Sequence, residues 1–162
     1  MNAKQVLKDC VLFADLDDGD LDKIVSFATE KEYEAGASMF SVGDNAEELF
    51  VIEEGRVAIQ MMLPRNPGQP SRRVTLDVAT RNEMAGWSAL IEPYRYTFAA
   101  VCMQKTVALA INGAKLKWAL RDNPEMGFEV MKGLTKVLAA GLNDTRQVLM
   151  SERLLAGQGG PA

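Results

Sequence analysis

The stretch Glu32–Gln60, EYEAGASMFSVGDNAEELFVIEEGRVAIQ, indicates how the chain folds. Short apolar segments such as 49–52 alternate in it with glycines at 36, 43 and 55. Glycine adopts a positive φ without steric cost, and tight turns between strands often require that conformation. The stretch therefore predicts short antiparallel strands joined by tight turns.

The same pattern continues on the C-terminal side of this stretch. The segments RRVTLDVA, YTFAAVCM and TVALAING are rich in β-branched and aromatic residues, and turn sequences such as PRNPGQP at 64–70 separate them. Short strands at close spacing with turn signals between them predict a sandwich or barrel. We expect about eight strands over residues 30–112.

Helical periodicity frames this strand-rich region. Residues 2–9 are compatible with a short helix, and a second one is expected to follow Asp18 or Asp20 as its N-cap. After the strands, GAKLKWALRDNP predicts a helix that stops before Pro124, where a long helix then begins.

The expected fold class is therefore α+β. It is a β-roll or jelly-roll-like antiparallel double sheet, flanked by short N-terminal helices and a long C-terminal helix. Residues 1–155 are expected to form one domain with its C-terminal helices over 113–155, and 156–162 a flexible tail.

Composition excludes several classes of function. The 162 residues are 48% hydrophobic and 25% charged, and no apolar run is long enough to cross a membrane. We expect a cytoplasmic protein without a membrane partner. The net charge of −4 disfavours nucleic acid, which needs a basic face. The chain has no histidine, so catalytic triads that use histidine and zinc sites with histidine ligands are excluded. The two cysteines, Cys10 and Cys102, are expected to be reduced thiols.

The glycine pattern resembles the cyclic-nucleotide-binding domain of the catabolite-activator type. The matching features are Gly36, the apolar pair 39–40, Gly43–Asp44, the strand 49–52 and the turn 55–57. The resemblance covers roughly residues 10 to 155 and implies the fold described above.

The resemblance also implies where a ligand binds. The family's cassette is Gly-Glu-x-Ala-Leu, a loop, and then Arg followed by small residues. It holds the ribose by the glutamate and the cyclic phosphate by the arginine and helix amides. Here the segment is GWSALIEPYRYTFAA, in which Gly86, Ala89 and Leu90 fit the pattern.

Two positions of this cassette depart from the family. Trp87 stands at the glutamate position, and counting back along the chain puts Thr97 at the arginine position, followed by Phe98. Arg95 lies two residues earlier and could still approach an anion. We therefore expect altered or weakened binding of cyclic nucleotides.

Two interpretations of this segment follow. In the first, the pocket is retuned for a planar or anionic small molecule, and no cofactor is required. In the second, its aromatic residues fill the pocket and leave a ligand-free dimerisation or interaction module. The candidate ligand-binding residues are Gly86, Trp87, Ser88, Ala89, Leu90, Arg95, Tyr96, Thr97 and Phe98.

The long C-terminal helix is the second functional element. An apolar stripe at three- and four-residue spacing runs along it, and in the family this helix forms a two-fold dimer interface. The candidate dimer residues are Met131, Leu134, Leu138, Gly141, Leu142, Thr145, Val148 and Leu149. We expect a homodimer.

The remaining expectations concern the class of protein. No catalytic or metal-binding constellation stands out, because the carboxylates fall mostly in turns and on solvated helix faces, so we expect no enzyme. The family's transcription factors carry a helix-turn-helix domain after the long helix, whereas here only LLAGQGGPA follows. We therefore expect regulation through an unknown protein partner rather than through DNA.

Overall fold

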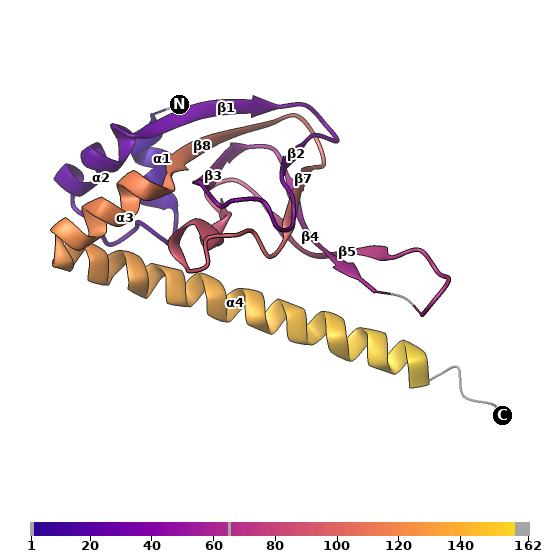
Figure 1. Ribbon diagram of the computed structural model, residues 1–162. Coiled ribbons are helices and arrows are strands. Elements are labelled where there is room, and N and C mark those ends of the chain that lie inside the picture. Colours follow the sequence, from indigo (N-terminus) through magenta and orange to yellow (C-terminus); the bar gives the residue numbers. More distant parts are fainter. Residues whose placement is uncertain (1, 65, 158–162) are drawn as a thin grey trace.

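The computed structural model describes residues 2–64 and 66–157, and their arrangement is shown in Figure 1. The helices of this part are α1 (Ala3–Asp9), α2 (Asp18–Val25), the short 3-10 helix η1 (Trp87–Leu90), α3 (Gly113–Asp122) and α4 (Pro124–Gly157). Its strands are β1 (Ala28–Tyr33), β2 (Ser38–Phe40), β3 (Glu48–Glu54), β4 (Val57–Leu63), β5 (Arg72–Ala79), β6 (Met84–Ala85), β7 (Ala99–Cys102) and β8 (Thr106–Asn112).

The strands form two antiparallel sheets. One has the order β1-β8-β3-β6 and the other the order β2-β7-β4-β5. With helices α1 and α2 before the strands and α3 and α4 after them, the α+β double sheet expected from the sequence is confirmed.

Side-chain caps set the starts of the N-terminal helices. The Asn2 side chain accepts a hydrogen bond from the Lys4 amide at 3.1 Å, which satisfies a free donor of α1. In α2 the cap is Asp17, which accepts from the Asp20 amide at 2.8 Å. The expected cap at Asp18 or Asp20 was thus one to three residues late, because several aspartates in a row give equivalent sequence signals.

The glycine turns have a steric basis. Gly55, between β3 and β4, has φ +106°, and a Cβ added to it would lie within 2.8 Å of the Lys105 carbonyl oxygen. Only glycine fits this turn without moving the neighbouring backbone. The turn holds β3 and β4 in the two different sheets.

One hydrophobic core joins the sheets to the helices. Its largest fully buried side chains come from α1 and the segment after it, from α2, from the inner faces of β3 and β8, and from α3 and α4. They are Phe13, Leu7, Leu12, Leu21, Ile24, Leu49, Ile52, Ile111, Leu116, Met126, Val6 and Val51. The N-terminal helices are therefore part of the fold rather than an appended segment.

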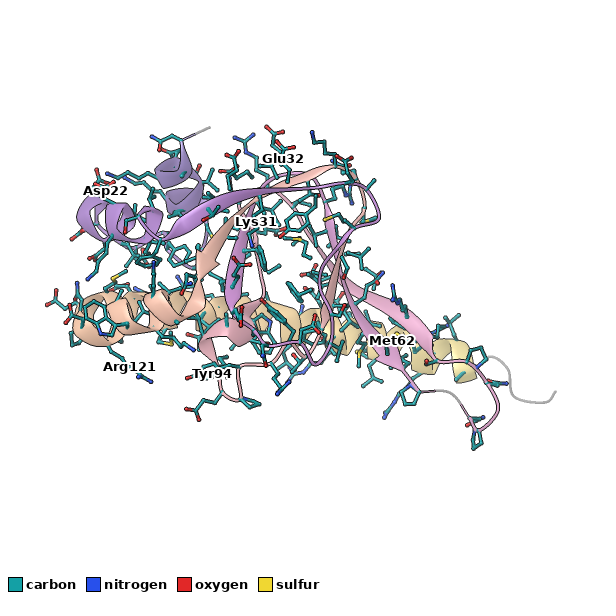
Figure 2. The ribbon with its side chains drawn as sticks, turned by 45° about the horizontal axis from the view of Figure 1, so that its top comes forward. Asp22, Lys31, Glu32, Met62, Tyr94 and Arg121 are labelled. Atoms are coloured by element: carbon teal, nitrogen blue, oxygen red, sulfur yellow. The ribbon has the colours of Figure 1, made fainter. Side chains whose placement is uncertain are left out.

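Helix α4 runs along the whole molecule, as Figure 1 shows. One face of its first turns is buried, at Met126, Val130, Gly133 and Leu134. Its C-terminal half runs beside the β4–β5 hairpin, whose Met62 is labelled in Figure 2. An ion pair of 2.7 Å between Arg72 and Glu152 joins the hairpin to this half of the helix. The helix ends at Gly157 rather than near 155, and residues 158–162 of the expected tail lie outside the described residues.

Two further features bear on the class of protein. No helix in the described ranges is long and apolar enough to cross a membrane. Cys10 and Cys102 are both buried free thiols, and burial raises the pKa of the Cys10 thiol to about 11. A thiol with that pKa stays protonated near neutral pH and is a poor nucleophile.

Candidate ligand-binding site

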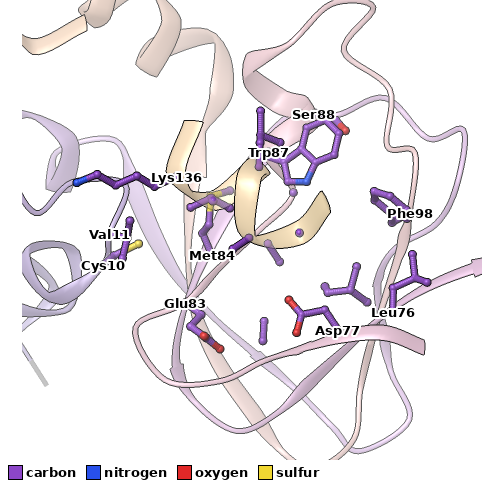
Figure 3. Close-up of a pocket in the computed structure, with 18 of the residues that line it drawn as sticks. Cys10, Val11, Leu76, Asp77, Glu83, Met84, Trp87, Ser88, Phe98 and Lys136 are labelled. Atoms are coloured by element: carbon purple, nitrogen blue, oxygen red, sulfur yellow. The ribbon is translucent and has the colours of Figure 1, made fainter. Parts of the chain in front are cut away.

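A cavity of about 490 Å³ opens between the β-roll and helix α4. Figure 3 shows side chains around it from the segment after α1, from β5, from the β6–η1 segment, from the approach to β7 and from α4. This volume falls in the range of small-molecule sites in proteins. Of the candidate residues, Gly86, Trp87, Ser88, Tyr96 and Phe98 line it.

Gly86 sets the sharp turn from β6 into η1. Its φ is +83°, and a Cβ there would lie 3.1 Å from the Glu48 carbonyl oxygen and 3.2 Å from the Tyr96 ring. The positive φ favours glycine, and a Cβ would also press against the backbone of β3 and the Tyr96 ring. This close approach places Trp87 and Ser88 at the cavity wall.

Trp87 and Phe98 form an aromatic wall of the cavity. Their rings meet edge to face, with centroids 6.1 Å apart and an interplanar angle of 68°. Both side chains are half-buried. They border the open volume, as Figure 3 shows, rather than occupying it.

Tyr96 combines a packing role with its place at the cavity. Its hydroxyl donates a 2.6 Å hydrogen bond to the Glu48 carbonyl oxygen, and its ring stacks on Phe40 with centroids 3.9 Å apart. Burial raises the pKa of Tyr96 to about 12, so the hydroxyl remains a neutral donor. The side chain is fixed by these contacts and offers a rigid surface to the cavity.

The other four candidate residues do not line the cavity. The Arg95 guanidinium donates to the Gly43 carbonyl oxygen at 2.9 Å, outside the cavity lining. Thr97 is exposed, whereas its neighbour Phe98 lines the wall. Ala89 is fully buried, and Leu90 is a half-buried residue of η1.

Thr97 lies outside the cavity lining, and its place at the family's arginine position stays a prediction. Strand β7 begins at Ala99, and the residue before it that faces the cavity is Phe98. Tyr94, labelled in Figure 2, lies earlier in the loop, and the Lys117 ammonium stands 3.4 Å from its ring centroid.

The structure adds charged residues that sequence analysis missed. Asp77 on β5, Glu83 before β6 and Lys136 on α4 line the cavity. Glu83 is engaged by Thr80, whose amide and hydroxyl both donate to one of its carboxylate oxygens. No local motif marks these residues, because only the tertiary packing of β5 against α4 brings them together.

Burial and two neighbouring carboxylates act on Asp77. Burial raises the pKa of Asp77 above its usual value, the 2.7 Å hydrogen bond from the Val78 amide lowers it, and the charges of Asp144 and Glu83 raise it further. This end of the cavity therefore has a negative potential.

The candidate dimer residues divide into two groups. Leu134 is buried in the core, and Leu138 and Gly141 line the cavity, so these three face their own domain. Val148 is half-buried, and Thr145 is exposed and donates to the Gly141 carbonyl oxygen at 2.9 Å.

The exposed group keeps an apolar stripe. Met131, Leu142 and Leu149 have 42%, 53% and 54% of their surface exposed, so the described part of the chain leaves this face of α4 only partly covered. Gly133, in contrast, lies against the backbone of Leu12, and it is not free for close approach of a second helix.

Comparison with known proteins agrees with this architecture. Residues 30–123 match the family model described as cyclic nucleotide-binding domain. The anaerobic regulatory protein of Bacillus subtilis (strain 168) is 27% identical over 139 residues, which is 85% of this chain and 56% of that protein. The chain therefore spans little more than half the length of this curated relative.

Solved structures share the fold. The N-terminal domain of a transcriptional regulator from Streptomyces coelicolor A3(2) has a TM-score of 0.68 at 25% identity, over 85% of this chain and 93% of that one. A cyclic nucleotide-binding domain from Methylobacillus flagellatus KT superimposes with a TM-score of 0.76 at 17% identity, over 93% and 82% of the two chains. At that identity the second likeness concerns the fold alone.

Proposed function

Because the chain belongs to the cyclic nucleotide-binding domain family, a family of non-enzymatic regulatory domains, we propose that it is a sensory module with altered or weakened specificity for cyclic nucleotides. A small molecule binds in the cavity beside Trp87, and the response passes through protein contacts rather than through DNA. The net charge of −4 and the uncovered apolar stripe of α4 support the second part of this proposal.

One observation carries the proposal. The cavity of about 490 Å³ lies at the segment that resembles the family's phosphate cassette, and aromatic Trp87 and Phe98 line it. Trp87 stands at the family's glutamate position and Thr97, next to Phe98, at its arginine position, so both charged anchors are absent. Hydrogen bonds to charged groups contribute about 1.5–3 kcal/mol each. Loss of two such anchors weakens affinity by roughly 10²-fold to 10⁴-fold, which leaves the cavity for a different ligand.

A ligand-free interaction module with an aromatic-filled pocket is the alternative. It predicts that Trp87 and Phe98 occupy the space that a ligand would take. The open volume beside these rings favours the ligand-binding form of the proposal.

We also propose that the chain forms a homodimer through α4. The stripe of Met131, Leu142 and Leu149 is exposed and apolar, and burying it against a second copy would remove it from water. Sedimentation velocity tests this proposal, and Leu149→Glu is expected to convert a dimer to a monomer. The control Ser151→Glu also introduces a glutamate at an exposed position of α4, and it is expected to leave the dimer intact. A wild-type monomer at high concentration contradicts the dimer.

Ligand binding is tested by fluorescence of Trp87. The chain has two tryptophans, and Trp118→Phe leaves Trp87 as the only one. Cyclic AMP, cyclic GMP and a set of planar small molecules are titrated while fluorescence and melting temperature are recorded. We expect a saturable change with at least one planar compound and little with the cyclic nucleotides.

A matched pair of variants locates the binding. Ala139 and Ala140 are neighbouring exposed residues of α4, and only Ala140 lines the cavity. Ala140→Phe is expected to weaken the binding of any ligand of the cavity, and Ala139→Phe is not. If no compound changes the signal, or both variants weaken binding equally, the ligand-binding proposal is wrong.

A further inference from the structure

A β-bulge in the β4–β5 hairpin directs two consecutive side chains into the cavity. Ile59 pairs with Asp77 and the next residue of β4, Gln60, pairs with Thr75, so Leu76 is an extra residue on β5. In a regular strand, side chains alternate between the two faces, and a bulge breaks that alternation. As a result, both Leu76 and Asp77 line the cavity.

Asp77 keeps acceptor capacity toward the open space. Asp77 is exposed, and within the described part of the chain its Oδ1 accepts a hydrogen bond from the Val78 amide at 2.7 Å. Figure 3 shows its carboxylate turned toward the space enclosed by the lining side chains. A carboxylate has about four acceptor sites, so a ligand donor can still be received here.

The charges around the cavity disfavour an anion. The lining contains the carboxylates of Asp77 and Glu83 and a single cationic side chain, Lys136. Figure 3 shows the Lys136 amino group directed away from Trp87 and Asp77. The Arg95 guanidinium is held by the Gly43 carbonyl oxygen outside the lining.

We propose that the cavity takes an aromatic amine in its protonated form, with the ring against Trp87 and Phe98 and the ammonium on Asp77. The proposal rests on the proposed function, because it names the ligand class of the same cavity. The ring gains apolar and edge-to-face contacts, and the ammonium gains a charge-assisted hydrogen bond. An anionic ring compound in the same position would bring its charge against the Asp77 carboxylate.

Three probes with one ring system and different charge test the proposal. Tryptamine carries an ammonium, 3-methylindole is neutral and indole-3-propionate carries a carboxylate. Calorimetric titration at neutral pH is expected to give a dissociation constant for tryptamine at least about tenfold below that of indole-3-propionate, with 3-methylindole between them. Tighter binding of indole-3-propionate or of cyclic AMP overturns the ligand class while leaving a ligand-binding cavity in place.

Variants then assign the effect to Asp77. Asp77→Asn is expected to weaken tryptamine by about tenfold and to change the affinity for 3-methylindole by less than about twofold. The control Asp122→Asn removes an exposed carboxylate that lies 3.8 Å from the Lys23 ammonium and outside the cavity, and it is expected to change neither. Equal effects of the two variants, or no binding of any of the three probes, overturn the inference. If none of the three probes binds, the titration with other planar compounds described above still tests whether the cavity binds a ligand at all.

Discussion

Two glycines of helix α4 are expected to respond to the same substitution with opposite signs. A Cβ added at Gly133 would lie 2.7 Å from the carbonyl oxygen and 2.8 Å from the Cα of Leu12, both of which are backbone atoms. A Cβ added at Gly141 has nothing within 4 Å. Gly133→Ala therefore forces α4 away from the segment after α1. In Gly141→Ala the added methyl group meets no other atom, and only the helix propensity of that position changes.

The magnitudes follow from this geometry. Alanine stabilises a helix interior by about 0.5–1 kcal/mol relative to glycine, and Gly141→Ala is expected to gain that amount. Gly133→Ala has the same gain, but overpacking against backbone costs about 1–3 kcal/mol or more. The net loss is then up to about 2.5 kcal/mol, and because both variants share the helix gain, they differ by the overpacking cost of about 1–3 kcal/mol.

Urea unfolding followed by far-ultraviolet circular dichroism measures both variants against the wild type. Both are expected to keep the native spectrum and an unchanged dependence on urea, with the midpoint higher for Gly141→Ala and lower for Gly133→Ala. If Gly133→Ala is as stable as Gly141→Ala, the close packing of α4 on Leu12 is wrong.

Three more predictions concern the cavity and the buried polar groups. Trp87→Glu with Phe98→Arg is expected to give cyclic AMP binding measurable by calorimetry, because Phe98 lines the cavity. Trp87→Glu with Thr97→Arg is not expected to bind, because Thr97 lies outside the lining, and equal binding by the two double variants contradicts this reasoning. Tyr96→Phe keeps the ring stacking but removes the 2.6 Å hydrogen bond to the Glu48 carbonyl oxygen. It is expected to lower the free energy of unfolding, measured in urea, by about 1 kcal/mol, and an unchanged value contradicts a stabilising role of the bond. Glu53 is 3% exposed, and burial raises the pKa of its carboxyl group. The folded state therefore holds the proton more tightly than the unfolded state. The stability that this group contributes is lost as the pH rises through its folded-state pKa. Glu53→Gln is therefore expected to stabilise the protein by about 1 kcal/mol at neutral pH and by much less at about pH 4, and a gain independent of pH contradicts this reasoning.

The sequence predicted the fold because its signals are local. Glycine at a turn such as Gly55 has a steric reason that is visible without the structure, and the change from period two to helical period near residue 112 marks the end of the sheets. The family resemblance rested on the same turns. These features agree with one another along the whole chain, which is why the architecture was predicted correctly.

The site was predictable only in part. The cassette pointed to Gly86, Trp87 and Ser88, which line the cavity, and also to Arg95 and Thr97, which lie outside the lining. Asp77 reaches the cavity through a β-bulge, and a bulge has no clear signal in a single sequence.

The long helix was ambiguous for another reason. Some of its apolar residues at three- and four-residue spacing pack into the core of the domain, and others lie on an exposed face. Leu134 and Leu149 belong to the same periodic pattern, yet one is buried and the other is 54% exposed. Periodicity identifies an apolar helix and does not tell which of its residues the same chain covers.

Leu142 belongs to two surfaces at once. It lines the cavity, and it is also 53% exposed on the stripe that includes Met131 and Leu149. A partner that covers Leu142 touches the rim of the cavity, so the two binding equilibria share a side chain. Thermodynamic linkage then requires reciprocity: whatever factor a cavity ligand applies to the dissociation constant of the partner, the partner applies the same factor to that of the ligand.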